Sequence, residues 1–560
     1  MDQALTPAVP AAGRRHWLLF GVLLFAEFLV FDRLVSQHHA WVFPRWNDQV
    51  QYPTEAYTSY ERLRADGLWA GIRESIRNPA AQGTLHDLAA VLIFAVVGPS
   101  RSAALSLNML AFLGWQAATF AAWRRLTGRW SFAWLAAGLL LGLRSLTAAV
   151  PGSPIDFRLD WLACCTVGVA VSLGLLHDGF RHRSWSVAFG LAVGVAITAR
   201  FLTLVYFAAA LAVLLLWLGG RLLRGPRAET GRRLLNLLLA VAAAAVALPL
   251  LWTNREWVYN YYWIGHLSGP ESALRSPNFG LTRSVDFIFR EALSSHHLGG
   301  FFWSLGAAGL AGLGGLAAWR RAAPAVPIPA GGRLLPAAGL GLLMFLIPGA
   351  VLVLHAQKSP LVVSVLLPGL TTVLLALLAG VARRLPATRF HQRAFAILAA
   401  GICLAGAWHF VTGYLRPPHP EMFVAGARKV NALADHFLAA SRRSHVETPR
   451  IAVSQVTDSL DAQIMRVICY ERRGVWMPFI MTLPTGIMEE SPELLHQRLR
   501  ESDFVLLTDA MPGEGRWPYD RQMRRLHPEM KAWADANLQA VESFPLFDRQ
   551  MTLYQRREIR

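Results

Sequence analysis

Two carboxylic acids, Asp48 and Glu55, lie in a segment rich in aromatic rings and amides, FPRWNDQVQYPTEAYTSYE (43–61). They are seven residues apart, so a helix through this segment would place both acids on one face. A carboxylate beside a substrate hydroxyl can act as a general base, and a second one can hold the substrate. Asp48 is therefore a catalytic candidate and Glu55 a substrate-binding candidate. The alternative is a solvated loop in which the two acids pair with Arg45 or Arg62.

A second pair of acids, Asp156 and Asp160, occurs in SPIDFRLDW (153–161), one helical turn apart where an apolar run begins. Two carboxylates that face the same way can bind substrate, orienting an acceptor hydroxyl, or hold a divalent cation such as Mg²⁺ or Mn²⁺. Acids at the start of a helix are also favoured by the helix dipole alone. Substrate binding, metal binding and helix capping therefore all remain open for this pair.

Two cations interrupt or follow long apolar runs and suit an anionic group such as a phosphate. Arg200 lies in ITARF (197–201), and Lys358 lies in HAQKSPLVVSVLLPGL (355–370). The guanidinium of arginine forms forked hydrogen bonds to phosphate, whereas lysine offers a point charge. Snorkelling of Arg200 to water and simple interfacial anchoring by Lys358 are the alternatives.

A third ring-rich stretch, YNYYWIGHLSGP (259–270), contains Tyr262 and His266 as further substrate-binding candidates. Aromatic faces pack on apolar surfaces, including those of sugar rings, so this loop is predicted to close over a lipid or a sugar. An aromatic belt at a membrane surface explains the same composition. We interpret His38, His39 and His355 as surface histidines.

The elements that position these residues are membrane helices. The chain has 560 residues, of which 54% are hydrophobic and 16% charged, and its apolar segments recur from residue 17 to about residue 413. This pattern is typical of a polytopic membrane protein, and we expect about 11–13 spans. The apolar segments lie near residues 17–35, 87–99, 102–123, 130–150, 162–178, 185–199, 201–219, 234–252, 301–319, 335–354, 361–381 and 394–413. Segment 87–99 is too short for a full crossing, so we expect it to dip into the membrane. If it does cross, the assignment of the loops to the two sides of the membrane changes.

The formal net charge of +18 reflects membrane topology. Arginines gather in alternate turns, as the positive-inside rule predicts for cytoplasmic loops, which argues against nucleic-acid binding. This pattern predicts a cytoplasmic N-terminus, with loops 36–86 and 253–300 on the outer side. The four cysteines, Cys164, Cys165, Cys403 and Cys469, imply neither a disulfide framework nor a metal knuckle.

The composition becomes that of a soluble domain after residue 415. RIAVSQV (450–456) and SDFVLLTDA (502–510) are predicted strands, DSLDAQIMRVICYERR (458–473) and PEMKAWADANLQAV (528–541) are predicted helices, and FPLFDRQMTLYQRR (544–557) is a predicted hairpin. We therefore expect two domains. Residues 1–415 form a mainly α membrane domain, and residues 416–560 form a small extracytoplasmic α/β domain.

Taken in order along residues 15–415, these motifs resemble the GT-C superfamily of polytopic membrane glycosyltransferases. The similarity is to the branch with protein O-mannosyltransferases and the lipid A aminoarabinose transferase. It rests on the acid in the first outer loop (Asp48), the acid that begins a later span (Asp156 or Asp160), the basic break in GLAVGVAITARF, and KSPLVVSVLLPGL. Relatives often carry two adjacent acids where Gln49 follows Asp48, and a lysine where Arg200 stands.

The resemblance implies an inverting transferase that moves a hexose or pentose from a polyprenyl-phosphate donor to a hydroxyl of a glycan, lipid or protein. Asp48 would be the general base, and Lys358 and Arg200 would stabilise the departing phosphate. Asp156 and Asp160 would orient the acceptor or a cation; the resemblance implies no other cofactor. The expected location is the inner membrane of a bacterial cell. A transporter or flippase for lipid-linked sugars, or a non-catalytic assembly subunit, are the alternatives, although no internal repeat supports transport.

Overall fold

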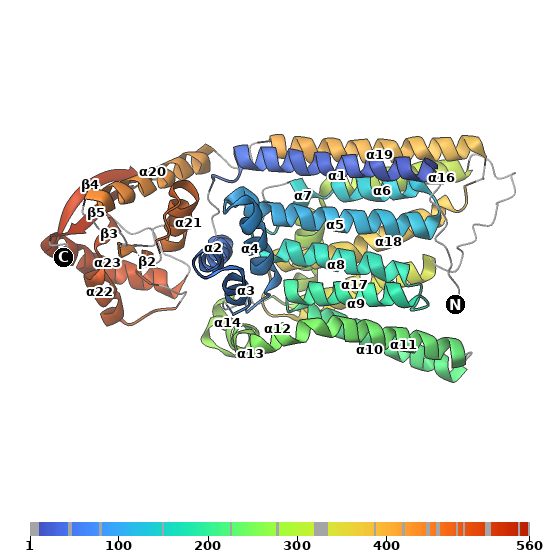
Figure 1. Ribbon diagram of the computed structural model, residues 1–560, viewed down its shortest axis with the longest axis horizontal. Helices are drawn as coiled ribbons and strands as arrows, with labels where there is room; N and C mark the ends of the chain where they lie inside the picture. Colours follow the sequence, from blue (N-terminus) through green and yellow to red (C-terminus); the bar gives the residue numbers. More distant parts are fainter. Residues whose placement is uncertain are drawn as a thin grey trace.

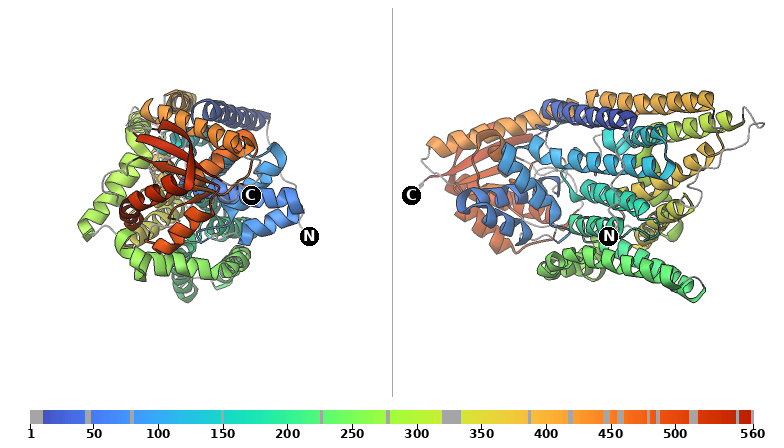
Figure 2. Two further views of the ribbon diagram at one scale, coloured as in Figure 1. Left: turned by 90° about the vertical axis from the view of Figure 1, so that its left-hand side faces the viewer. Right: turned by 45° about the vertical axis from the view of Figure 1, so that its right-hand side comes forward.

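The computed structural model is an elongated molecule with a helical bundle and a smaller α/β domain beyond one end of it (Figure 1). Figure 2 shows the same arrangement from two further directions, with the α/β domain in front of the bundle in the left-hand view. The structure describes residues 11–42, 48–77, 81–147, 151–224, 227–275, 279–318, 334–385, 388–416, 421–443, 449–454, 460–477, 480–484, 488–509, 517–546 and 549–557.

Long apolar helices run side by side through the bundle (Figure 1). Among the described residues, eight helical stretches are long and apolar enough to cross a membrane. They lie in α5 (Arg101–Thr127), α8 (Leu159–Leu176), α10 (Thr203–Arg224), α11 with η1 and α12 (Arg227–Ala244, Ala245–Ala247 and Leu248–Thr253), α15 with η3 and α16 (Leu281–Asp286, Phe287–Leu298 and Gly299–Ala318), α17 (Leu334–Leu354), η5 with α18 (Leu361–Leu366 and Leu367–Ala382), and α19 (Arg389–Leu415).

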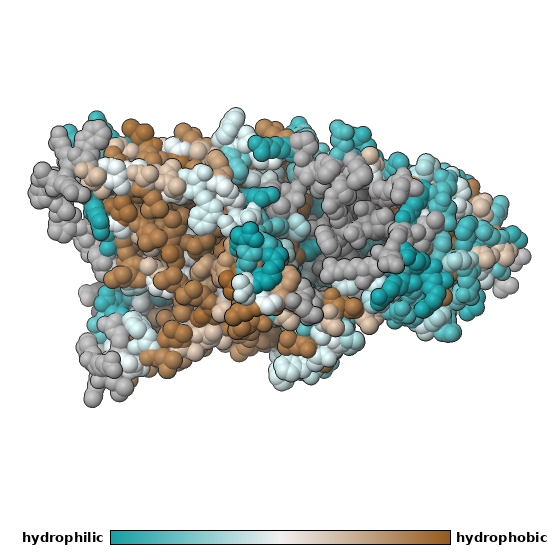
Figure 3. Space-filling view, turned by 180° about the vertical axis from the view of Figure 1, so that it is seen from behind, coloured by the Kyte–Doolittle hydropathy of each residue, from teal (hydrophilic) through white to brown (hydrophobic). Residues whose placement is uncertain are grey.

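Three further apolar helices lie along the bundle: α1 (Ala11–His38), α6 (Trp130–Leu141) and α9 (Arg183–Ala199). Helices α6 and α19 approach closely at Gly138, because a glycine has no side chain. A Cβ at this position would lie only 2.6 Å from the Cα of Cys403. Short α7 (Arg144–Thr147) follows α6. Seen from behind, a broad hydrophobic band covers the bundle and hydrophilic residues cover the α/β domain (Figure 3). The polytopic helical bundle expected from the sequence is confirmed.

Smaller helices gather at the end of the bundle that faces the α/β domain (Figure 1). They are α2 (Asp48–Asp66), α3 (Leu68–Arg77), α4 (Leu85–Val97), α13 (Arg255–Tyr259), η2 (Asn260–Ser268) and α14 (Pro270–Arg275). Helix α4 is the short apolar segment predicted at 87–99, and it packs against α2 and α3. The turns α5–α6, α8–α9 and α10–α11 lie at the opposite end. The arginine-rich turns and the predicted outer loops are therefore at opposite ends of the bundle.

The α/β domain contains one five-stranded sheet in the order β2-β1-β3-β5-β4. Strands β1 (Ile451–Val453), β2 (Ile480–Thr482) and β3 (Phe504–Thr508) are parallel, and β5 (Arg549–Arg556) is antiparallel to β3 and to β4 (Leu538–Leu546). The helices are α20 (Glu421–Arg443), α21 (Ala462–Arg473), α22 (Pro492–Glu501) and α23 (Pro518–Asn537).

The two strands and the final hairpin predicted in this domain are confirmed. The helix predicted over 528–541 is wrong at both ends. It begins ten residues earlier, at Pro518, and it ends at Asn537, because residues from Leu538 onward pair with β5.

Candidate functional site

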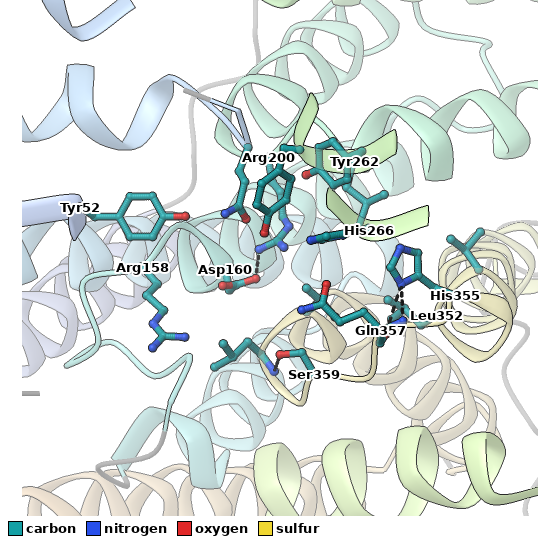
Figure 4. A pocket seen from close by; sticks show the side chains of 16 residues that line it. Tyr52, Arg158, Asp160, Arg200, Tyr262, His266, Leu352, His355, Gln357 and Ser359 are labelled. Carbon is teal, nitrogen blue, oxygen red and sulfur yellow. Dashed lines mark hydrogen bonds and ion pairs between the residues drawn. The ribbon is translucent and has the colours of Figure 1, made fainter. Parts of the chain in front are cut away.

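A cavity of about 90 Å³ lies where the bundle meets its outer helices. Six segments that are separate in the sequence converge on it (Figure 4). Its polar or aromatic lining consists of Tyr52 from α2, Gln82 from the loop before α4, Arg158 and Asp160 at the start of α8, Arg200 at the end of α9, Tyr261, Tyr262 and His266 from η2, and His355, Gln357 and Ser359 after α17. Four of the predicted site residues line this cavity: Asp160, Arg200, Tyr262 and His266.

An ion pair between Arg200 and Asp160 forms one side of the cavity (Figure 4). Both residues are buried, with 6% and 5% of their surface exposed. Asp160 is in the first turn of α8, and Arg200 is the C-terminal cap of α9. Each charge thus lies at the helix end that its sign favours. Two helix termini therefore supply a buried carboxylate and a buried guanidinium at one point.

The neighbouring segment 82–84 is held against Arg200 by backbone hydrogen bonds. The Phe201 N–H donates to the carbonyl of Gln82 at 2.7 Å, and the Thr84 N–H donates to the carbonyl of Thr198 at 2.9 Å. This pairing places the Gln82 amide at the cavity beside the charged pair. An amide supplies both a donor and an acceptor, which suits recognition of hydroxyl groups.

Asp156 shapes its own loop. Its Oδ2 accepts a hydrogen bond of 2.6 Å from the N–H of Gly152, and its Oδ1 lies 3.4 Å from Nε of Arg158. Asn108 fixes the same loop by donating to the carbonyls of Pro154 and Asp156, at 3.1 and 2.9 Å. Asp156 thus anchors the arginine that lines the cavity, Arg158.

The predicted cation ligands, Asp156 and Asp160, face different arginines. Within the ranges described above, no group of three or more His, Cys, Asp or Glu side chains could hold a metal ion. Metal binding by this pair stays a prediction.

The segment η2 contributes rings from one face. The rings of Tyr261 and His266 are 4.5 Å apart, and that of His266 is 5.7 Å from that of His355. Burial raises the pKa of Tyr262, although Arg200 opposes that shift, so the phenol keeps its proton. Burial also lowers the pKa of His355, with Lys358 and Arg200 adding to the effect, so this imidazole is neutral at pH 7.

The Lys358 ammonium is directed to the end of a helix. Its Nζ donates to the carbonyls of Leu352 at 3.2 Å and Val353 at 2.8 Å, and also to that of His355. These carbonyls belong to the last turn of α17 or directly follow it, where cations are favoured. Lys358 therefore caps α17, and its neighbours His355, Gln357 and Ser359 line the cavity.

The first acidic segment forms α2, which begins at Asp48. The side chain of Asp48 lies outside the described residues. Helical spacing puts position 48 one turn before Tyr52, which lines the cavity. Glu55 lies one turn further, half-buried, and accepts a hydrogen bond of 2.7 Å from Gln51. Position 48, Tyr52 and Glu55 therefore share one face of α2. Tyr52 brings that face to the cavity.

The predictions missed seven polar or aromatic lining residues: Tyr52, Gln82, Arg158, Tyr261, His355, Gln357 and Ser359. The sequence signal for three of them was the polar run HAQKS directly after a long apolar segment. Tyr52 lay inside the acidic, ring-rich segment itself. Gln82 had no signal of its own, because only the fold brings segment 82–84 to the end of α9.

Similar architectures exist among solved structures. The structure of ArnT from Cupriavidus metallidurans in the apo state superimposes with a TM-score of 0.56 at 16% sequence identity, over 97% of this chain and 98% of that one. ArnT from the same organism bound to undecaprenyl phosphate gives a TM-score of 0.54 at 15% identity, over 96% and 97% of the two chains. An oligosaccharyltransferase, AglB from Archaeoglobus fulgidus in complex with an inhibitory peptide and a dolichol-phosphate, gives 0.43 at 12% identity, over 94% and 72%.

No protein-family model matches the sequence, and neither does any curated protein. The likeness to ArnT extends over nearly the full length of both chains, including the α/β domain. The chain therefore shares the overall fold of ArnT.

Proposed function

We propose that this protein is an inverting glycosyltransferase that moves a sugar from a polyprenyl-phosphate donor to an acceptor hydroxyl. The observation that carries the proposal is a charged cavity beside an apolar one. A second cavity, of about 180 Å³, lies between α9, α10, α11 and α17 and is lined almost wholly by apolar side chains. Its lining includes Ile197 and Leu204, which flank Arg200 in the sequence.

This combination suits one class of molecule. A polyprenyl-phosphate sugar has a long isoprenoid chain, an anionic phosphate and a polar sugar in series. The apolar cavity accepts the chain by burying its surface. Arg200 and Arg158 line the polar cavity, where the phosphate that follows the chain would lie. Gln82, Gln357 and Ser359 line the same cavity and offer hydrogen bonds to sugar hydroxyls. The binding of undecaprenyl phosphate by ArnT, whose fold is similar, supports the same assignment.

The residues would share the reaction as follows. Asp48 takes the proton of the acceptor hydroxyl, and the oxygen of that hydroxyl attacks the anomeric carbon. The bond from that carbon to the phosphate oxygen breaks, so the configuration inverts and the lipid phosphate leaves with an added negative charge. Arg200 and Arg158 stabilise this charge in a buried setting. Asp160 orients the guanidinium of Arg200, or the acceptor.

The reaction is proposed for the extracytoplasmic side of a bacterial inner membrane. Support comes from the position of the site at the end of the bundle opposite the arginine-rich turns (Figure 1). A nucleotide sugar made in the cytoplasm has no direct access to that end. A lipid-linked donor reaches the site by lateral diffusion.

The test uses the purified protein in nanodiscs, with radiolabelled hexoses and pentoses on undecaprenyl phosphate and a mixed pool of glycan, lipid and peptide acceptors. Wild type is expected to release undecaprenyl phosphate and to label an acceptor. Asp48→Asn should slow transfer by about 100-fold or more. Asp66→Asn, which removes an exposed acid from the other end of α2, is the matched control and should keep wild-type rates.

Two results would contradict the proposal. Wild type that neither binds undecaprenyl phosphate nor transfers any sugar refutes the assignment as a transferase. Full activity of Asp48→Asn, with active wild type, refutes only the choice of base.

A further inference from the structure

A buried polar cluster joins the α/β domain to the outer end of the bundle. The Glu471 carboxylate, on α21, accepts a hydrogen bond of 2.7 Å from Oη of Tyr57 on α2. The same Oε1 lies 3.0 Å from Nε of Arg101 at the start of α5. The Arg101 and Glu471 side chains are only 7% and 9% exposed. Tyr470 adds a second link by donating to Glu61 of α2.

Each charge in this cluster lies at the end of its helix where the helix dipole disfavours that sign of charge. Arg101 is the first residue of α5, where the helix dipole disfavours a cation. Glu471 is in the last turn of α21, where the dipole disfavours an anion. Each charge is therefore unfavourable within its own helix, and burial adds a desolvation cost. The pairing of Arg101 with Glu471 offsets these costs when the two helices meet, so it favours the docked arrangement.

The phenols in the cluster act as hydrogen-bond donors. Burial and the nearby Glu471 raise the pKa of Tyr57, and burial together with Glu61 raises that of Tyr470. Both hydroxyls hold their protons at any physiological pH. Their rings also contact each other, with centroids 4.9 Å apart. The contact between α2 and α21 is thus made of paired polar groups and two tilted rings in contact.

Helix α2 presents two different faces to its surroundings. Val50, Thr54, Tyr57 and Glu61 follow one helical stripe, and the last two of these contact α21. Position 48, Tyr52, Glu55 and Ser59 follow another stripe. Tyr52 of that stripe lines the polar cavity, and Oγ of Ser59 donates to Asp87 of α4 at 2.9 Å. Helix α2 is therefore clamped between the α/β domain and α4, with its first turn at the cavity.

We propose that Glu471 is a positioning residue, whose pairing with Arg101 and Tyr57 docks the α/β domain on α2 and so fixes the first turn of α2 over the cavity. This inference rests on the proposed function for its effect on turnover. The structural part of the inference, that docking of the α/β domain orders α2, does not depend on the proposed function. Glu471 itself is not among the residues that line the cavity. The α/β domain thereby becomes part of the scaffold of the site.

The experiment compares three variants of the full chain in nanodiscs. Glu471→Leu removes the carboxylate that pairs with Arg101. Arg101→Met/Glu471→Leu/Tyr57→Phe replaces the three groups that meet at Glu471 by apolar ones and leaves the link between Tyr470 and Glu61 in place. Replacing a buried ion pair by apolar groups is often neutral or stabilising. Asp66→Asn breaks the exposed 2.8 Å bridge to Arg62 on the same helix and is the control. The measurements are amide hydrogen exchange of α2, the Kd for undecaprenyl phosphate, and kcat for transfer.

In Glu471→Leu, exchange of the α2 amides should accelerate by about tenfold or more, since these amides exchange through local undocking. Displacement of the first turn should lower kcat by about 100-fold, while Kd for undecaprenyl phosphate changes by less than about threefold. The triple variant should recover most of both losses, and the control should match wild type. Recovery by apolar groups distinguishes positioning from a chemical role for the carboxylate.

Unchanged exchange of α2 in Glu471→Leu would overturn the inference, whatever the activity. Faster exchange with unchanged kcat would overturn the positioning role. If wild type transfers no sugar, the proposed function fails, and the exchange data still decide whether the cluster docks α2. Should Glu471→Leu fail to accumulate, Glu471→Gln removes the charge and retains an acceptor for Tyr57, so it gives the same comparison.

Discussion

Replacing Arg200 by methionine tests the site most directly. The substitution leaves Asp160 buried without its ion-pair partner, since both side chains are almost fully enclosed. Removal of one member of such a pair costs about 3–5 kcal/mol. In a large domain about 1 kcal/mol corresponds to roughly 2 °C in Tm, so Tm should fall by roughly 6–10 °C. If Arg200 also binds the lipid phosphate, loss of a charged hydrogen bond worth about 1.5–3 kcal/mol should raise Kd for undecaprenyl phosphate by about 10- to 150-fold.

The double variant Arg200→Met/Asp160→Leu separates the two effects. It removes both charges, so most of the lost Tm should return, whereas the affinity for undecaprenyl phosphate should stay low. Tm is measured by scanning calorimetry in nanodiscs, and Kd by titration of the lipid. Affinity at the wild-type level in the double variant would show that Arg200 does not bind the phosphate. Wild-type Tm in the single variant would show that the ion pair does not contribute to stability.

Further predictions concern groups outside the cavity. Burial raises the pKa of Asp461 to about 6 in the folded chain. The folded chain therefore binds the proton of Asp461 more tightly than the unfolded chain does. The resulting stabilisation is complete below the unfolded pKa near 4 and disappears as pH rises through 6, so the free energy of unfolding should fall by about 3 kcal/mol over that interval. Asp461→Asn should flatten this part of a plot of Tm against pH. Lys358→Met should lower stability by about 1–2 kcal/mol because three carbonyls lose their donor; a Tm equal to that of wild type would contradict the capping role. Gly152→Ala forces an alanine to a φ of +77° and should destabilise the chain by about 1–2 kcal/mol, with Gly128→Ala as a second left-handed position away from the cavity.

Much of the membrane part could be predicted from hydrophobic runs, since their lengths match helices that cross a bilayer. The capping role of Lys358 also had a sequence signal, because a cation that closely follows a long apolar helix is in the right place for its last carbonyls. In the α/β domain, β1, β3 and the β4–β5 hairpin were predictable, because β-branched and aromatic residues cluster there. Strand β2 (Ile480–Thr482) was not predicted.

The site was harder to predict because its residues meet only through tertiary packing. Asp160 and Arg200 were each recognised as candidates, but nothing local indicates that residues 40 positions apart form a pair. The pairing of Glu471 with Arg101 spans 370 positions and runs against both helix dipoles, so local rules disfavour it. Gln82 reaches the cavity through backbone hydrogen bonds that carry no side-chain signature.

The apolar cavity between α9, α10, α11 and α17 also affects how binding should be measured. A cavity lined by such side chains in a membrane-spanning bundle also suits acyl chains, so a ligand that enters it competes with lipid or detergent. Occupancy then depends on the mole fraction of the ligand within the bilayer, and the aqueous volume of the sample is irrelevant. A titration in micelles dilutes the ligand with every added detergent molecule, and the apparent Kd should rise in proportion to the detergent present.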